Sequence, residues 1–384
     1  MLPYFAGFVL LVLIGYAALL LQYKKCFSRL KEFHVEGAAL KRNVRFSIVI
    51  PARDEAQNIG ACLRSILGNE YPLADYEIIV MDDFSTDETG RIVKNIAESY
   101  PNVRLLHMRE LIPEATQLNS YKKKAIDLAI GKATGDWIVT TDADCTVGKK
   151  WLRSFASYIG QTGNVFVAAP VRFTDDGSFM GIFQSLDFLG LQGITAASVS
   201  AGFHSMCNGA NLCYKKTAFY AVEGFKGVDQ LASGDDMLLM HKMQKVFAGK
   251  MGYLFSREAI VSTLPMPDLQ SFLNQRIRWA SKAGSYEDKR IVAVLAGVYL
   301  LNVLLLAGLA VCFFHPEFMW TWLAWMSVKI VSEMFFLVPV ARFYGNISLM
   351  WYFPVMELPH VLYTVSAGLL GSFGKYKWKG RKVK

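Results

Sequence analysis

The sequence predicts an α/β domain with a mostly parallel sheet, carried between membrane helices at the two ends of the chain. Three observations predict this fold class. From Arg45 onward, short apolar runs typical of strands alternate with helical patterns, as in a parallel sheet. Apolar segments of about 20 residues, the length needed to cross a bilayer, lie at both ends. Acidic pairs follow two of the strand-like runs, where open α/β sheets bind their ligands.

An N-terminal membrane helix is expected over residues 1–22. Residues 2–21 carry no charge. The basic start and the small-residue cleavage site of a signal peptide are both missing from this segment. An uncleaved anchor is therefore favoured over a secretory leader.

Three further apolar segments lie within residues 290–374. They span residues 291–314, 318–340 and 347–373. Lys329 and Glu333, four residues apart in the second, can pair on one helical face away from lipid. Two prolines, Glu357 and His360 interrupt the third, which is typical of a re-entrant or interfacial helix. We expect two to three C-terminal membrane helices, and a different pairing of the segments stays open.

Composition and charge point to a membrane surface. Of the 384 residues 53% are hydrophobic, the mean hydropathy is +0.27 and the formal net charge is +9. Basic residues gather after the first apolar segment and in a C-terminal tail over residues 375–384. This favours anionic lipid over nucleic acid as a partner. The protein is expected in the cell (inner) membrane, and by the positive-inside rule the central domain and the tail are expected on its cytoplasmic side. One of the three C-terminal segments, we expect the last, must then not cross fully.

The central domain shows its elements in a regular order. Strands are expected at residues 46–50, 77–81, 103–107 and 136–141, and helices near residues 58–67, 88–99, 122–131 and 237–247. Six cysteines show no paired or metal-ligand spacing, so we expect free thiols.

Five polar motifs occur in a fixed order in and just after this domain. They are Ile48–Glu55 with Asn58–Ile59, Asp82–Asp87, Asp142–Ala143–Asp144, Asp235–Asp236 and Gln275–Trp279. Together they resemble the membrane-bound family 2 glycosyltransferases, a group that includes cellulose, chitin and hyaluronan synthases and ceramide glucosyltransferases. The resemblance covers residues 44–282. It implies a GT-A (Rossmann-like) domain over residues 44–262, followed by an interfacial amphipathic helix over residues 263–288.

The acids after the fourth expected strand are the candidate metal ligands. Asp142 and Asp144 lie on one side of an extended segment, because side chains alternate along a strand. There they can hold a Mg²⁺ or Mn²⁺ that bridges the diphosphate of a nucleotide sugar. A solvated turn is the alternative.

The nucleotide is expected at the ends of the first two strands. Pro51, Ala52 and Glu55 follow the first strand and Asp83 follows the second. The resemblance implies that a carboxylate here accepts the N3–H of uridine, while Asp82 braces the loop or the sugar end. Helix capping is a rival role for other polar residues of these loops.

Lys122 is the candidate contact to phosphate or sugar, because the family often has a Gly-Lys at this place. Tyr121 stands where the glycine is expected. Three consecutive lysines begin this helix, so the residue that points inward stays open. A solvated basic face is the alternative for each.

Asp236 is expected to be the general base and Asp235 its neighbour or a sugar ligand. The pair resembles the family's acidic motif, which is usually Glu-Asp, and the base activates the acceptor hydroxyl. Helix capping at the start of residues 237–247 is the alternative. Asn208 and Gly209, together with Phe183–Asp187, resemble acceptor-side elements of the family.

Gln275, Arg278 and Trp279 form the family's Gln-X-X-Arg-Trp signature. The resemblance implies that Arg278 stabilises the leaving diphosphate and that Trp279 stacks on the acceptor. Anchoring of an amphipathic helix is a compatible role.

These observations together predict an inverting, metal-dependent transferase that moves a sugar from a UDP-sugar, UDP-GlcNAc or UDP-glucose being favoured, to a lipid or lipid-linked acceptor. A processive β-polysaccharide synthase subunit is the alternative, with a further membrane protein or a second copy as a partner. A nucleotidyltransferase and a non-catalytic scaffold are more remote.

Overall fold

The computed structural model describes residues 2–35, 44–112, 118–174, 176–203, 206–231, 233–282, 286, 288–371, 376–378 and 381–383. The chain forms two compact units. The sheet unit comprises Lys31–Thr174, Ser205–Leu264 and Lys377–Lys384, and the helical unit comprises Met1–Leu30, Asp175–His204 and Pro265–Tyr376. Each unit therefore gathers segments that lie far apart in the sequence.

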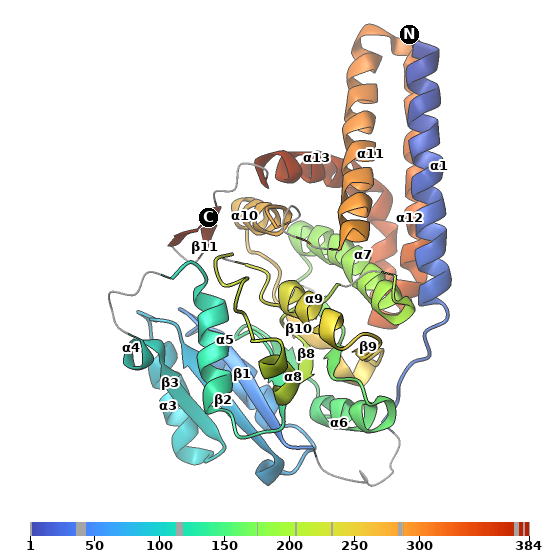
Figure 1. The fold of residues 1–384 in the computed structure, drawn as a ribbon. Helices are drawn as coiled ribbons and strands as arrows, with labels where there is room; N and C mark the ends of the chain where they lie inside the picture. The colour runs from blue at the N-terminus through green and yellow to red at the C-terminus, as the bar shows by residue number, and fades with distance from the viewer. Residues whose placement is uncertain are drawn as a thin grey trace. The chain divides into compact units, whose positions relative to one another are not determined.

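A seven-stranded sheet forms the centre of the sheet unit (Figure 1). Its strands lie in the order β3 (Val103–His107), β2 (Tyr76–Asp82), β1 (Phe46–Ala52), β4 (Trp137–Thr140), β8 (Leu212–Lys215), β6 (Phe166–Ala168) and β9 (Met251–Tyr253). β1 pairs in parallel with β2 and β4, and β2 with β3, whereas β8 runs antiparallel to β4 and β6. The predicted α/β fold with a mostly parallel sheet is confirmed.

β1 and β2 end level with each other. Their residues are almost all buried, as expected for continuous apolar runs in a sheet covered on both faces. Ala52 at the end of β1 lies opposite Asp82 at the end of β2, and the N–H of Asp83 donates to the carbonyl of Ala52 at 2.8 Å. The loops that follow β1 and β2 therefore start side by side.

Helices and a smaller sheet complete the sheet unit. The helices are α2 (Ile59–Leu67), η1 (Leu73–Asp75), α3 (Thr89–Ser99), α4 (Met108–Leu111), α5 (Tyr121–Lys132), α6 (Trp151–Thr162), α8 (Lys216–Ala221), α9 (Met237–Val246) and η2 (Arg257–Ala259). In the smaller sheet β10 (Val261–Thr263) pairs with β5 (Thr146–Val147) and β7 (Val171–Phe173). The helices expected near residues 58–67, 88–99, 122–131 and 237–247 correspond to α2, α3, α5 and α9.

The helical unit contains the candidate membrane helices. Its elements are α1 (Leu2–Phe27), α7 (Phe179–Ala201), α10 (Leu269–Ala280), α11 (Lys289–Phe314), η4 (Pro316–Phe318), α12 (Met319–Tyr344), η5 (Ile347–Trp351) and α13 (Phe353–Gly371). Among the described residues, three helices are long and apolar enough to cross a membrane: Leu2–Phe27, Lys289–Phe314 and Pro316–Tyr344. These three run side by side, whereas α13 crosses their direction (Figure 1). One N-terminal and two C-terminal helices of the described residues are thus candidate membrane spans, which matches the lower of the two expected numbers.

Helix α7 belongs to the helical unit, although the sequence-based division placed its residues within the domain 44–262. A glycine lets it pack closely on α12. A Cβ atom at Gly193 would lie 2.6 Å from Val340 Cγ2 and 2.9 Å from Phe336 Cζ, closer than carbon atoms can approach. Only a glycine fits at this point of contact between the helices.

The expected basic tail is described in part. Residues 376–378 and 381–383 form β11 (Tyr376–Trp378) and β12 (Arg381–Val383), which pair with each other. Residues 375, 379, 380 and 384 lie outside the described residues.

Candidate functional site

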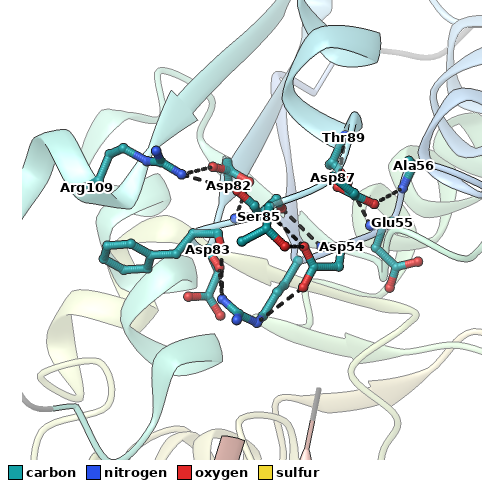
Figure 2. A network of polar contacts seen from close by, with 12 residues as sticks. Asp54, Glu55, Ala56, Asp82, Asp83, Ser85, Asp87, Thr89 and Arg109 are labelled. Carbon is teal, nitrogen blue, oxygen red and sulfur yellow. Dashed lines mark hydrogen bonds and ion pairs between the residues drawn. The ribbon is translucent and has the colours of Figure 1, made fainter. Parts of the chain in front are cut away.

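Hydrogen bonds join the loop after β1 to the loop after β2 (Figure 2). The side chain of Asp54 accepts from the N–H of Thr86 at 2.8 Å, and the N–H of Asp54 donates to Ser85 Oγ at 3.1 Å. Further along the two loops, the N–H of Ala56 donates to Asp87 Oδ2 at 2.9 Å. Asp54, Ser85 and Asp87, for which helix capping is the rival role, therefore hold two separate loops together.

Each of these two loops contains one residue in a left-handed conformation. Asp54 has φ of 49° and Phe84 has φ of 54°. Non-glycine residues seldom adopt this conformation, which costs on the order of 1 kcal/mol. Arg53 offsets the cost, because its Nη1 donates to the carbonyls of Asp83 at 2.7 Å and Phe84 at 3.0 Å. The Arg53 guanidinium thus fixes the backbone at the end of β2 from the end of β1.

Asp82 and Asp83 are both buried at this end of the sheet, each only 2% exposed. Asp82 Oδ1 accepts from the N–H of Ser85 at 3.2 Å, and Oδ2 lies 3.0 Å from His107 Nδ1. Asp82 therefore braces the loop, one of the two roles expected for it. The other expected residues, Pro51, Ala52 and Glu55, occupy the facing end of β1, and the Glu55 carboxylate accepts from Asn58 Nδ2 at 2.9 Å.

Lys122 joins two acidic motifs that are far apart in the sequence. Its Nζ lies 2.7 Å from Asp142 Oδ1 after β4, and 3.4 Å from Asp235 Oδ2 before α9. Burial alone would lower the pKa of Lys122, but the carboxylates of Asp142 and Asp235 raise it above the usual range. The lysine is therefore charged, and it marks the place where the two motifs meet.

The three consecutive lysines of α5 have three different environments. Lys123, 1% exposed, donates to the carbonyls of Val228 (2.9 Å), Leu231 (2.5 Å) and Ser233 (2.9 Å). Lys124 is half-exposed and pairs with Asp127 one turn along the helix. Successive residues of a helix point about 100° apart, so only Lys122 meets the acids. Lys123 instead holds the loop that leads to Asp235.

Asp236 caps α9 and also holds a second loop. Its Oδ1 accepts from the N–H of Met237 at 2.7 Å, and its Oδ2 accepts from the N–H of Gly209 at 3.1 Å. A Cβ atom at Gly209 would lie 3.2 Å from Asp235 Oδ2 and 3.7 Å from Lys122 Nζ, so the glycine admits the acidic pair. Asn208 shapes the same turn, because its Oδ1 accepts from the N–H of Ala210 at 3.0 Å. Capping, the alternative role for Asp236, is thus present in the structure.

Two family models match this chain. Glycosyl transferase family 2 matches residues 47–192, and Glycosyl transferase family group 2 matches residues 137–365, which is more than half of the chain. The chain belongs to glycosyltransferase family 2. The resemblance of the five motifs is thereby confirmed.

Named relatives of this family 2 protein are similar over limited segments. Glycosyltransferase AglE of Haloferax volcanii is 32% identical over 128 residues, which are 33% of this chain and 40% of that protein. A beta-monoglucosyldiacylglycerol synthase of Nostoc sp. is 28% identical over 106 residues, which are 28% of this chain and 21% of that protein. The chain therefore spans less than half the length of these relatives.

A solved structure resembles the fold of the family 2 protein over nearly its whole length. The mannosyltransferase PcManGT from Pyrobaculum calidifontis, in complex with GDP-Man and Mn²⁺, has a TM-score of 0.60 and 17% identity. The match covers 97% of this chain and 99% of that one. It therefore extends beyond the sheet unit to the helices at both ends.

Asp142 and Asp144 suit a hard divalent cation. Both are half-buried, while Ala143 and Cys145 are buried. The segment is not extended as expected, because β4 ends at Thr140 and the N–H of Cys145 donates to the carbonyl of Asp142 at 3.2 Å, which closes a turn. No group of three or more ligating side chains occurs in the described part of the chain. A Mg²⁺ or Mn²⁺ ion held here would complete its shell with water and phosphate oxygens, which is the usual binding mode of Mg²⁺.

The signature residues Gln275, Arg278 and Trp279 all lie on α10 of the helical unit. Gln275 Oε1 is buried and has no hydrogen-bond partner among the described residues. Arg278 and Trp279 are half-buried.

Sequence reasoning missed two basic residues that organise the two units, Lys123 of the sheet unit and Arg276 of α10. Arg276 is 4% exposed and pairs with Asp187 of α7 at 2.7 Å. Arg276 lies four residues after Phe272 and three before Trp279, and this spacing places it on the apolar stripe of a helix. An arginine there requires a partner, so the spacing could have predicted a buried ion pair.

Proposed function

We propose that this family 2 glycosyltransferase is an inverting, metal-dependent enzyme that transfers a sugar from a UDP-sugar to a membrane lipid or lipid-linked acceptor, forming a β-linkage. UDP-GlcNAc and UDP-glucose are the favoured donors. The observation that carries the proposal is the position of Lys122, which contacts Asp142 and Asp235 together. In this proposal Asp142 is a donor-side acid and Asp235 an acceptor-side acid, and a single displacement needs the two substrates to be held close together.

The donor is proposed to bind at the ends of β1, β2 and β4. Pro51, Ala52 and Glu55 would line the nucleoside, and Asp83 would accept a ring N–H of the base. Asp142 and Asp144 would hold Mg²⁺ or Mn²⁺, which when bound neutralises charge on the diphosphate. Lys122 adds positive charge at the same place, where the leaving diphosphate gains negative charge.

Asp236 is proposed to accept the proton of the acceptor hydroxyl, with Asp235 beside it as a sugar ligand. Oδ2 of Asp236 is held by the N–H of Gly209 and Oδ1 by the N–H of Met237, and each oxygen keeps a second lone pair for a substrate proton. This fixed orientation supports a base that accepts the proton of the acceptor hydroxyl from one direction only, while the hydroxyl oxygen attacks the sugar. Gln275, Arg278 and Trp279 would act on the acceptor and the diphosphate.

A lipid acceptor is favoured over a growing polymer. Three helices among the described residues can span a membrane, which is few for a polysaccharide channel. The Nostoc relative is named as a synthase of a glucosyl lipid. A processive synthase subunit, working with a partner or further copies, is the alternative, and a nucleotidyltransferase is distinguished by release of pyrophosphate instead of UDP.

The test uses detergent-purified protein and its Asp236→Asn variant with membrane lipids and Mg²⁺ or Mn²⁺. Each protein is incubated with UDP-glucose, UDP-GlcNAc and GDP-mannose, and released nucleotide and radiolabelled product are measured. Asparagine caps a helix as well as aspartate does, so this variant keeps α9 while removing the base. Asp229→Asn is the matched control, because Asp229 is an exposed acid on the loop before α9.

The proposal expects UDP release with one donor, label in the organic phase, and loss of both in Asp236→Asn but not in Asp229→Asn. Label in an insoluble polymer would favour the synthase instead. Equal rates for Asp236→Asn and the native enzyme would contradict the role of Asp236. Release of GDP from GDP-mannose alone would contradict the choice of donor.

A further inference from the structure

Buried charged side chains connect three helices at the centre of the helical unit. Lys329 of α12 contacts Glu333 one turn along the same helix at 2.7 Å, and it also contacts Glu357 of α13. The hydroxyl of Tyr16 in α1 donates to Glu333 at 2.5 Å. The pairing of Lys329 with Glu333 suggested by their spacing is therefore present, and it is extended by a third charge from another helix.

The same chain of charges continues to α7 and α10. His360 of α13 lies 3.6 Å from Glu357, and its Nε2 lies 3.5 Å from Asp187 Oδ1 in α7. Asp187 Oδ1 also accepts a hydrogen bond from Tyr363. Asp187 Oδ2 lies 2.7 Å from Arg276 Nη2. We call these six charged residues the charge chain: Glu333, Lys329, Glu357, His360, Asp187 and Arg276.

The charge chain contains three acids and three bases, so its charges can balance. Five of the six side chains are buried: the exposed fractions of Lys329 and Glu357 are 1%, and those of Arg276, Asp187 and Glu333 are 4%, 6% and 9%, whereas His360 is 26% exposed. Apolar side chains of similar volume often stabilise a fold as well as a buried ion pair does. Lys329 and Glu333 also lie on α12, a candidate membrane span, and ionisable groups in such helices are rare and usually mark function. Stability alone is therefore a weak reason for six of them in one place.

At its end, the charge chain fixes a residue of α10 that touches the signature. The guanidinium of Arg276 lies 4.2 Å from the ring centroid of Trp279 and 4.8 Å from that of Phe272. α10 also abuts α13 directly, because a Cβ atom at Gly371 would lie 2.8 Å from Ala280 Cβ. Arg276 thus packs against Trp279 while Asp187 sets the position of its charge.

We infer that Asp187 is a positioning residue: through Arg276 it orients α10 and the Trp279 ring for the acceptor. The inference rests on the proposed function of Trp279 and its neighbours in sugar transfer. Misplacement of a reacting group by a small distance can cost about 100-fold in rate, so a residue that touches no substrate can still control transfer. The uncharged isostere at this position, Asp187→Asn, should release Arg276 and with it the ring.

Two readouts test the inference on the full-length protein in detergent. The first is the access of a soluble quencher to Trp279, isolated as the difference in emission between proteins with and without Trp279→Phe. The second is the rate of sugar transfer as a function of acceptor concentration, with UDP binding measured separately. Asp187→Asn is expected to raise quencher access to Trp279 and to lower kcat/KM for the acceptor by about 10- to 100-fold, with UDP binding unchanged. Glu317→Gln, at an exposed carboxylate beside η4, is the control.

The double variant Asp187→Asn/Arg276→Met removes both charges. It therefore distinguishes the effect of lost positioning from the effect of leaving the Arg276 charge buried without its partner. If it too shows an exposed Trp279 and slow transfer, the inference is supported. Native quenching and native rate in the double variant would overturn the inference, as would unchanged values in Asp187→Asn. Should Asp187→Asn fail to fold, the double variant is measured in its place. Where the native protein transfers no sugar, the proposed function fails, and the quenching of Trp279 still decides the inference.

Discussion

Lys122 Nζ lies 2.7 Å from Asp142 Oδ1, so a protein ammonium group contacts one of the two carboxylates that suit a divalent cation. A divalent cation bound there, as proposed, would compete with Lys122 for this oxygen. Coulomb repulsion between two cations is appreciable at such a distance in a partly buried site. We therefore expect metal affinity at Asp142 and Asp144 to be coupled to the position of Lys122.

Replacing this lysine should strengthen metal binding and weaken catalysis at once. In Lys122→Met we expect the affinity for Mn²⁺ without nucleotide to rise several-fold, because a competing charge is removed, while sugar transfer falls. Titration followed by electron paramagnetic resonance of free Mn²⁺ measures the affinity. Lys124→Met, on the half-exposed side of α5, should change neither quantity. Unchanged or weaker Mn²⁺ binding in Lys122→Met would refute the competition.

Lys123→Met should destabilise the sheet unit. The variant leaves three carbonyls, those of Val228, Leu231 and Ser233, without their shared donor. Hydrogen bonds to a charged group are strong, so we expect a loss of about 2–4 kcal/mol in the free energy of unfolding. Urea denaturation measures it, with Lys124→Met again as the control. A loss no greater than that of the control would show that the loop before Asp235 does not depend on Lys123.

Asp236→Ala and Asp236→Asn should differ in stability, although the proposed function expects both to be inactive. Alanine cannot accept from the N–H of Met237 or Gly209, and loss of an N-cap costs about 1 kcal/mol. Asparagine keeps an acceptor oxygen. Thermal unfolding of the two variants beside the native protein measures the difference. Equal melting temperatures in the two variants would show that Asp236 does not act as the cap.

Glu77 of β2 should make the fold sensitive to acid. Burial raises its pKa, but hydrogen bonds from Thr134, Ser47 and Arg104 together lower it below 4.5. A carboxyl whose pKa is depressed in the folded state adds stability above its unfolded pKa, and this stability is lost as pH falls through the folded pKa. Glu77→Gln should therefore be less stable than the native protein at neutral pH.

The difference should shrink as the pH falls below 4.5, where the carboxyl becomes protonated. Chemical denaturation of both proteins between neutral and acid pH measures it. Glu88→Gln, at an exposed carboxylate, is the control. A difference in the free energy of unfolding that stays constant down to the lowest pH would show that the ionised Glu77 carboxylate does not stabilise the fold.

A fluorescent protein fused to the C-terminus should report a cytoplasmic tail. Two candidate spans follow the sheet unit, and two crossings return the chain to the side of the membrane from which it started. Lys24, Lys25 and Arg29, after the N-terminal span, favour the cytoplasm as that side. Bright fluorescence is expected, because the fused protein folds in the cytoplasm and not after export. A dark fusion that is nevertheless inserted would mean that α13 also crosses or that the orientation is reversed.

Local pattern was enough to predict much of the fold. The apolar runs predicted β1 and β2, whereas Asp142 and Asp144, expected on an extended segment, lie in a turn after β4. Helix α5 was predicted too, yet the choice among its three lysines was not. That choice depends on where Asp142 and Asp235 lie in space, which no local pattern contains.

The pairing of Asp187 with Arg276 lay beyond sequence reasoning for the same reason. The two residues are far apart in the chain, and the residues of α7 were expected within the domain 44–262, whereas α7 belongs to the helical unit. The close approach at Gly193 depends on Val340 and Phe336, which lie on another helix. Long-range partners of this kind are visible only once the chain is folded.

Hydrogen bonds of Arg53, Asp54 and Asp87 hold the loops after β1 and β2 to each other. Loops ordered in advance lose little conformational entropy when a ligand arrives. We therefore expect association of the nucleoside to be limited by diffusion and its dissociation by the strength of the contacts. Variants that cut these hydrogen bonds would then slow the arrival of the donor more than they hasten its departure.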